Sequence, residues 1–161
     1  ERVGWWKIWS MDVQNKTFLQ LTDASQAEYG PYWSPDSKRI VFVSDRDGNS
    51  EVYIMDRDGK NLENITQDNA ADTMPFWADN GKIYYSSEQK GIYQIMTVNP
   101  DGTDKKALTK SKGNKYMPQP SPDGKGVLFY GDKDGNPEIY LMDTIKRWRI
   151  DTKSKDNAIR D

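Results

Sequence analysis

Neither cysteine nor histidine occurs anywhere in the 161 residues. Without cysteine the chain can form no disulfide, no thiolate metal site and no thiol nucleophile, although it is compatible with any redox compartment. Without histidine it lacks the most frequent general base and the most frequent metal ligand. Ser34 and Ser121 each lie in a Ser-Pro-Asp turn, with no histidine to activate them. We therefore predict that this chain is not an enzyme by itself.

Long apolar runs and a strong net charge are missing too. No apolar run approaches the roughly 20 residues that a bilayer requires, so we expect no membrane span. The net charge is -2, from 23 basic and 25 acidic residues, which gives no global attraction to nucleic acid. The chain begins Glu-Arg-Val-Gly, without an initiator methionine or the apolar core of a signal peptide, so we expect a processed, trimmed or partly observed chain.

Apolar residues are scarce in general. The hydrophobic share is 35% and the mean hydropathy is -0.96. Disorder would explain this polarity, but the aromatic share of 12% argues against it, because disordered chains avoid tryptophan and tyrosine. Several narrow sheets with many exposed turns would account for both observations.

What the sequence does contain is an internal repeat with a period of 43 or 44 residues. Its clearest copy runs from Pro31 to Gly59 and reads as three short strands joined by two tight turns. Positions that recur in step include Pro31, Pro75 and Pro118, then Ile40, Ile83 and Val127, then Met11, Met55, Val98 and Met142. A period of about 40–45 residues with strand-like runs and glycine-bearing turns indicates the blade of a β-propeller.

The repeat divides the chain into blade units of four antiparallel strands. We predict full blades at 29–66, 72–109 and 116–151, an outer half blade at 1–22, and a polar tail at 152–161. The predicted fold is therefore all-β, with three full blades plus an outer half blade. Because a propeller needs about four blades to close, we expect a partial propeller. A missing segment, a second chain or a longer natural protein would complete it.

Aromatic side chains recur in fixed phase with the repeat. We interpret them as core between blades, in preference to a platform for stacking sugars. The residues concerned are Trp33, Trp77, Phe42, Tyr85 and Phe129. The run Ile40–Val43 is apolar and mostly β-branched, which is typical of a strand buried on both faces.

The repeat resembles the TolB-like propeller repeats, also called WD40-like or PD40 repeats. Residues 31–56 follow the family pattern Pro-x-Trp-Ser-Pro-Asp, a buried strand, Ser-x-Arg-Asp-Gly-Asn and Ile-Tyr-x-Met-Asp nearly throughout. Residues 121–143 follow it as well, with Pro120 in place of the tryptophan. In the middle unit, Ala78-Asp79-Asn80 stands where the family has Ser-Pro-Asp. The resemblance covers residues 1–151.

The resemblance implies a six- or seven-bladed propeller, often exported in bacteria, that binds other proteins at its faces and mouth. We accordingly expect a non-enzymatic protein-binding or assembly module in the periplasm or another extracytoplasmic compartment. Similar propellers are also non-catalytic domains of proteases and the body of some pectin-degrading lyases. The alternative is therefore an accessory propeller of a larger hydrolase or lyase whose catalytic residues lie outside this chain.

Two further features admit a ligand. The Asp-x-Asp-Gly turns at 45–48, 56–59 and 132–135 place glycine fourth, whereas an EF-hand loop places it sixth, so we expect turns here, with no metal and no cofactor. The segment Lys146-Arg147-Trp148-Arg149, with Lys153 and Lys155, is locally basic. We interpret it as a solvated outer strand and tail, with no nucleic-acid partner.

The alternation of strands predicts which loops share a face. Turns between second and third strands should lie with the linkers between blades, and the residues after each linker should rim the central channel. Loops held on a rigid scaffold are where binding usually occurs. The predicted partner-binding residues are Glu28, Tyr29, Asp45, Arg46, Asp47, Asn49, Asp72, Thr73, Lys115 and Tyr116.

Overall fold

The computed structural model describes residues 5–133, 135–144 and 149–151, and these residues form strands and turns without a helix. The strands make four antiparallel sheets, one of two strands and three of four. The predicted all-β fold, with three full blades and an outer half blade, is confirmed. No helix within the described ranges is long and apolar enough to cross a membrane.

Each sheet is a meander in which neighbouring strands are consecutive in the chain. The half blade contains β1 (Trp9–Asp12) and β2 (Thr17–Gln20). Blade I contains β3 (Glu28–Trp33), β4 (Arg39–Ser44), β5 (Glu51–Asp56) and β6 (Glu63–Asn64). Blade II contains β7 (Asp72–Trp77), β8 (Ile83–Gln89), β9 (Ile92–Val98) and β10 (Lys106–Ala107). Blade III contains β11 (Lys115–Pro120), β12 (Gly126–Gly131), β13 (Glu138–Asp143) and β14 (Arg149–Asp151).

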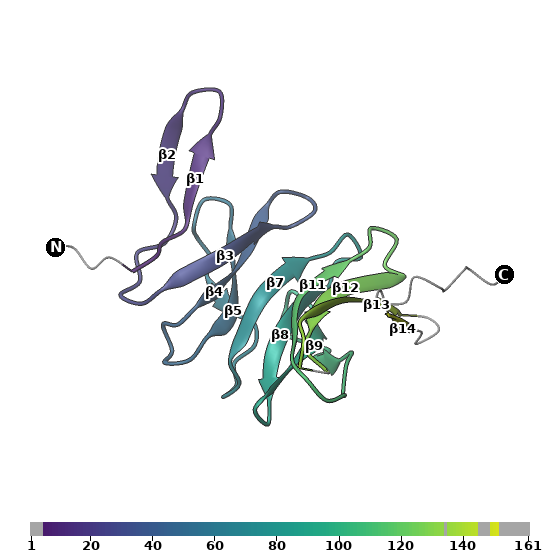
Figure 1. The fold of residues 1–161 in the computed structure, drawn as a ribbon. Helices are drawn as coiled ribbons and strands as arrows, with labels where there is room; N and C mark the ends of the chain where they lie inside the picture. Colours follow the sequence, from purple (N-terminus) through teal and green to yellow (C-terminus); the bar gives the residue numbers. More distant parts are fainter. Residues whose placement is uncertain (1–4, 134, 145–148, 152–161) are drawn as a thin grey trace.

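The three full blades stand side by side. In Figure 1 their first strands, β3, β7 and β11, follow one another across the molecule, while the β1–β2 hairpin projects away from the full blades. The predicted tail at 152–161, and the basic side chains from Lys146 to Lys155, lie outside the described residues.

Packing between successive blades forms the core. Residues 40–43 are at most 4% exposed, which confirms that β4 is buried on both faces. On one side, β4 and β5 pack with Trp77 and Tyr85 of blade II; on the other, Phe42 packs with Ile8 and Leu21. Phe129 belongs to a third cluster between blades II and III. The core positions predicted for Trp77, Phe42, Tyr85 and Phe129 are therefore confirmed.

Trp33 is the exception: it is 47% exposed, so the prediction that it is a core residue is wrong. Its counterpart Trp77 packs against Val41 of β4 and Ile54 of β5, the second and third strands of the preceding blade. The sheet that precedes blade I consists of β1 and β2, which correspond to third and fourth strands. Trp33 consequently lines a cavity of about 200 Å³ beside Trp9.

The innermost strand of every full blade carries a bulge. Strand register shifts between Tyr29 and Tyr32 in β3, and at equivalent positions in β7 and β11. The residue at each bulge has a left-handed backbone, with φ of +62° at Gly30, +52° at Met74 and +54° at Met117. Proline follows in each case, and it cannot donate to the ladder. The bulge re-aims the side chains of the strand, as bulges near binding sites often do.

Candidate interaction face and acidic junction

The β4–β5 turn lies between the linker before β3 and the linker before β7. The backbone N–H of Asp45 donates to the carbonyl of Ala27 (3.1 Å), and that of Asp72 donates to the carbonyl of Ser50 (2.7 Å). The hydroxyl of Tyr29 lies 3.1 Å from that of Ser50. The structure thus brings the predicted residues of this turn together with those that begin β3 and β7.

Glu28 and Arg46 form an ion pair inside this face. The carboxylate of Glu28 is fully buried, and the hydroxyl of Ser44 also donates to it (3.4 Å). The guanidinium carbon of Arg46 lies 5.0 Å from the centroid of the Tyr53 ring. Both charges are therefore used within blade I.

The aspartates of the turn make local hydrogen bonds. Asp45 Oδ1 accepts from the hydroxyl of Ser50 (2.7 Å). Asp47 accepts from the hydroxyl of Tyr53 and from Nδ2 of Asn64 (3.0 Å). Burial, and then Asp47, raise the pKa of Tyr53, which stays neutral as a donor. These carboxylates close the turn and tie it to β5 and β6.

The remaining predicted residues differ in exposure. Tyr29, Thr73 and Tyr116 are half-buried at the start of β3, β7 and β11, and Lys115 is buried. The ring of Tyr116 packs against that of Tyr93, with centroids 4.9 Å apart. Lys115 and Tyr116 begin β11 at the boundary between blades II and III, whereas the β4–β5 turn contacts the linkers before β3 and β7.

Three carboxylates meet where blade I passes into blade II, and we call Glu51, Asp68 and Asp72 the acidic junction. One oxygen of each lies within 4.8 Å of the others. Glu51 is 2% exposed and accepts from Nδ2 of Asn49 (2.9 Å), from the N–H of Asp68 (3.1 Å) and from the hydroxyl of Thr66. Asp72 is 0% exposed, and neither of its carboxylate oxygens has a hydrogen bond of normal geometry. The hydroxyls of Ser87 and Thr66 are close enough to act on its pKa without forming such a bond.

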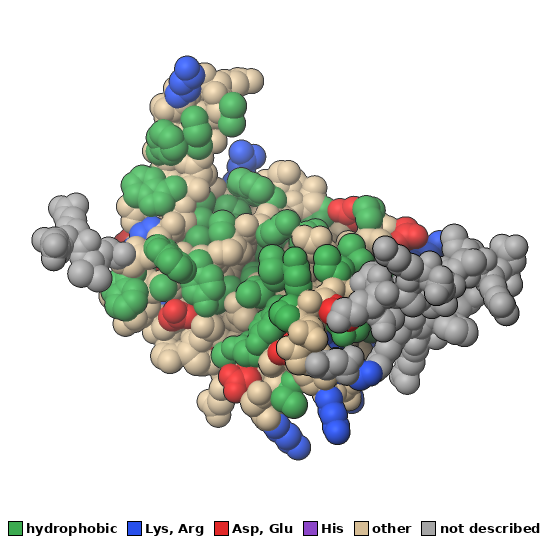
Figure 2. Space-filling model, viewed as in Figure 1, with side chains coloured by type: hydrophobic (Ala, Val, Ile, Leu, Met, Phe, Trp, Pro, Cys, Tyr) green, Lys and Arg blue, Asp and Glu red, His purple; other side chains and the backbone are tan. Residues whose placement is uncertain are grey.

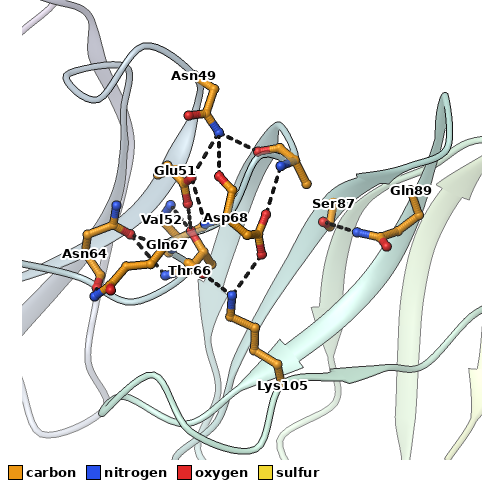
Figure 3. Close-up of polar contacts among 11 residues, drawn as sticks. Asn49, Glu51, Val52, Asn64, Thr66, Gln67, Asp68, Ser87, Gln89 and Lys105 are labelled. Carbon is orange, nitrogen blue, oxygen red and sulfur yellow. Dashed lines mark hydrogen bonds and ion pairs between the residues drawn. The ribbon is translucent and has the colours of Figure 1, made fainter.

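The electrostatics of the acidic junction are unfavourable to ionised Asp72. Burial raises the pKa of Asp72 to about 7; the hydroxyls of Ser87 and Thr66 oppose the rise, and the negative charges of Asp68 and Glu51 add to it. Among the described residues, one cation contacts the acidic junction: the ammonium of Lys105 pairs with Asp68 (2.8 Å) and donates to the carbonyl of Thr66 (Figure 3). Burial and the same three carboxylates raise the pKa of the Tyr85 hydroxyl.

Apolar side chains lie exposed along the innermost strands. Met74 and Met117, at the bulges of β7 and β11, are 40% and 48% exposed. Tyr32 and Trp33 of β3 are exposed as well. Figure 2 shows hydrophobic side chains gathered over the region where β3, β7 and β11 lie in Figure 1. We call Tyr32, Trp33, Met74 and Met117 the inner-strand surface.

Sequence reasoning missed several of these residues. Glu51 and Asp68 were not among the predicted site residues, although aligning the repeats would have shown that these two positions and that of Asp72 are all acidic in one unit only. Met74 and Met117 were hidden by their position before a proline, in what reads as an ordinary strand. Their left-handed backbone follows from the bulge, which the sequence does not reveal.

Comparison with known proteins identifies the family. A family profile described as TolB beta propeller domain matches residues 4–116, which include the half blade, blade I and blade II. The chain belongs to the TolB β-propeller family. A TolB homolog from Chlorobium luteolum is 31% identical over 142 residues, which are 88% of this chain and 32% of that protein.

Solved structures support the same fold. TolB from Acinetobacter baumannii matches with a TM-score of 0.76 at 22% identity, over 89% of this chain and 36% of that one. A puromycin-hydrolyzing peptidase from Mycobacterium tuberculosis matches with a TM-score of 0.71 at 17% identity, over 86% of this chain and 23% of that one. At such identities the likeness shows the fold alone. The chain spans about a third of the length of the two TolB proteins.

Proposed function

We propose that this chain is part of a non-enzymatic propeller that binds an extended segment of another protein through the inner-strand surface. The observation that carries the proposal is the exposure of Met74 and Met117 at equivalent bulges of neighbouring blades. Both residues hold a left-handed backbone that is uncommon for a side chain of this size. Such backbone conformations persist where the surrounding structure imposes them, and they concentrate at functional positions.

The chemistry of the surface favours an apolar segment as the partner. Methionine adapts its shape to apolar partners, and tyrosine and tryptophan contribute large contact areas. By contrast, the charged groups of the β4–β5 turn are already paired within the blade, as Glu28 is with Arg46. The turn and linkers then serve to fix the position of the innermost strands. We also propose that the protein is extracytoplasmic, which the family resemblance supports.

The second candidate is an accessory propeller of a larger hydrolase or lyase. Its support is the shared fold of the puromycin-hydrolyzing peptidase. In that case the inner-strand surface would face a catalytic domain of the same polypeptide, and the chain itself would still contribute no catalytic group.

Site-specific photo-crosslinking in cells tests both candidates. A photoreactive amino acid replaces Met74 or Met117 in the intact protein, and replaces the exposed Lys106 of β10 as the control. We expect one discrete adduct with a separate protein from both methionine positions and none from Lys106. Crosslinks within the same polypeptide would favour the accessory propeller. Adducts of equal yield at all three positions, or none at the methionines, would contradict the proposed surface.

A further inference from the structure

The acidic junction has counterparts at the other two blade boundaries. Each boundary has an equivalent threonine, from which the corresponding positions can be counted. The hydroxyl oxygen of Thr66 accepts the backbone N–H of Val52 (3.0 Å). Thr22 accepts the N–H of Ile8 (3.0 Å) in the same way, and Thr109 accepts that of Ile95 (2.9 Å). Counting from these threonines, the positions of Glu51, Asp68 and Asp72 are held by Lys7, Ala24 and Glu28 at the first boundary, and by Gln94, Ser111 and Lys115 at the third.

At the third boundary a lysine occupies one of the three equivalent positions. Lys115 stands where Asp72 does, and its Nζ donates to the carbonyls of Ser111 (3.1 Å), Lys112 (3.1 Å) and Gly113 (2.6 Å). Lys115 is only 5% exposed. A cation is therefore enclosed by backbone oxygens of the linker between blades.

At the first boundary a lysine again enters the linker. Lys7 stands where Glu51 does, and its Nζ donates to the carbonyls of Ala24 and Gln26. Glu28, in the position of Asp72, pairs with Arg46. At two of the three boundaries, a lysine ammonium therefore donates hydrogen bonds to carbonyls of the linker between blades.

At the middle boundary the equivalent carbonyls, those of Asp68 and Ala70, accept from Nδ2 of Asn49 and from no ammonium of the described residues. The ammonium of Lys105 contacts the Asp68 carboxylate and the carbonyl of Thr66 instead. In the described part of the chain, no lysine or arginine forms an ion pair with Glu51 or Asp72. Nδ2 of Asn49 faces three oxygens at once: Oε1 of Glu51 (2.9 Å), the carbonyl of Asp68 (3.1 Å) and the carbonyl of Ala70 (2.7 Å) (Figure 3). An amide group has two hydrogens, so three acceptors exceed what it can satisfy.

We propose that the acidic junction is a binding site for a divalent cation, Ca²⁺, held by the carboxylates of Glu51, Asp68 and Asp72. The convergence of three carboxylates within 4.8 Å supplies the charge. Asp72 supplies the independent observation, because a fully buried carboxylate with both oxygens unpartnered points into the cluster. Buried carboxylates are otherwise hydrogen-bonded or paired.

The donor set fits calcium better than the alternatives. Ca²⁺ takes six to eight oxygen ligands in flexible geometry, whereas Mg²⁺ demands a near-ideal octahedron and keeps several waters. With neither cysteine nor histidine in the chain, transition metals lack the thiolate and imidazole ligands that they prefer. The ion would join Glu51 of blade I to Asp72 of blade II, and so fasten the two blades together.

Terbium luminescence and thermal unfolding of the intact protein at pH 8 test the proposal. Tb³⁺ occupies oxygen-ligand calcium sites, and Tyr85, whose hydroxyl feels the charges of all three carboxylates, is the expected sensitiser. We expect Ca²⁺ to displace Tb³⁺ with a Kd on the order of 10⁻⁴ M and to raise Tm. The variant Asp72→Asn should weaken binding by about tenfold or more, because a ligand charge is lost. The exposed Asp79→Asn, outside the junction, is the matched control and should bind as the wild type does.

The result that overturns the proposal is equally specific. If Ca²⁺ shifts neither the Tm nor the terbium signal of the wild type, the junction is not a cation site. Equal calcium affinities for Asp72→Asn and Asp79→Asn would exclude it as well. Should Asp72→Asn fail to fold, Asp68→Asn decides the matter, because Asp68 is exposed and its replacement removes a second proposed ligand.

Discussion

The guanidinium carbon of Arg39 lies 4.8 Å from the centroid of the Trp77 indole ring. Arg39 begins β4 in blade I and Trp77 ends β7 in blade II, so the contact crosses a blade boundary. Trp33 occupies the position of Trp77 one blade earlier, and the half blade has no counterpart of β4 within the described residues. The same sequence motif therefore has two different environments.

The two tryptophans should differ in their contribution to stability. Trp77→Ala should cost about 3–5 kcal/mol, as other truncations of large core residues do. Trp33→Ala should cost roughly 1 kcal/mol or less, because its ring is half exposed. Urea unfolding of the 161-residue chain measures both. Equal losses would mean that Trp33 is covered in solution.

The contrast between Trp33 and Trp77 also shows which parts of the structure could be predicted from the sequence. The repeat predicted strands, turns and the number of blades, because in-phase alternation leaves few other folds. The prediction that Trp33 is buried was wrong because burial at this position requires a strand of the preceding blade, and the residues around Trp33 do not encode that strand. The acidic junction was not predicted for a similar reason: Glu51 and Asp72 lie in the sheets of different blades, and the contact between blades I and II brings them together.

Gly59 should tolerate no side chain. Its φ is +84°, and a Cβ there would come within 2.7 Å of the backbone oxygen of Leu21 in the preceding linker. Gly59→Ala should therefore destabilise the chain by about 1–3 kcal/mol through strain and the clash. Gly48→Ala is the control: φ is +100°, but a Cβ would meet nothing within 4 Å. Thermal unfolding should show the smaller loss for Gly48→Ala, and the reverse order would be inconsistent with close packing at Leu21.

The acidic junction should make stability depend on pH when divalent ions are removed with a chelator. Asp72 ionises near its ordinary pKa of 3.8 when unfolded, but burial and its neighbours Asp68 and Glu51 raise the folded pKa to about 7. The folded state therefore keeps a proton that the unfolded state has released. The stability contribution of Asp72 is fully present below pH 4, falls between about pH 4 and pH 7, and is constant above.

The variant Asp72→Asn isolates this effect. It keeps the size of the side chain but does not titrate, so the pH profile of wild type minus variant removes the contributions of Glu51, Asp68, Lys105 and Tyr85 to a first approximation. We expect the wild type to lose on the order of 3 kcal/mol relative to the variant between pH 4 and pH 8. Urea unfolding across that range measures the difference. A flat difference would show that Asp72 titrates normally.

Binding of the crosslinked partner to a variant with a charged inner-strand surface tests the proposed function most directly. Met74→Glu and Met117→Glu together place two carboxylates among exposed apolar side chains, where they should leave the fold intact. We expect unchanged circular dichroism and a Kd for the purified partner at least about tenfold weaker, because the contact loses apolar burial and gains desolvated charge. The control Lys106→Glu should bind normally. A folded double variant that binds its partner with wild-type affinity would contradict the proposal that these strands form the binding surface.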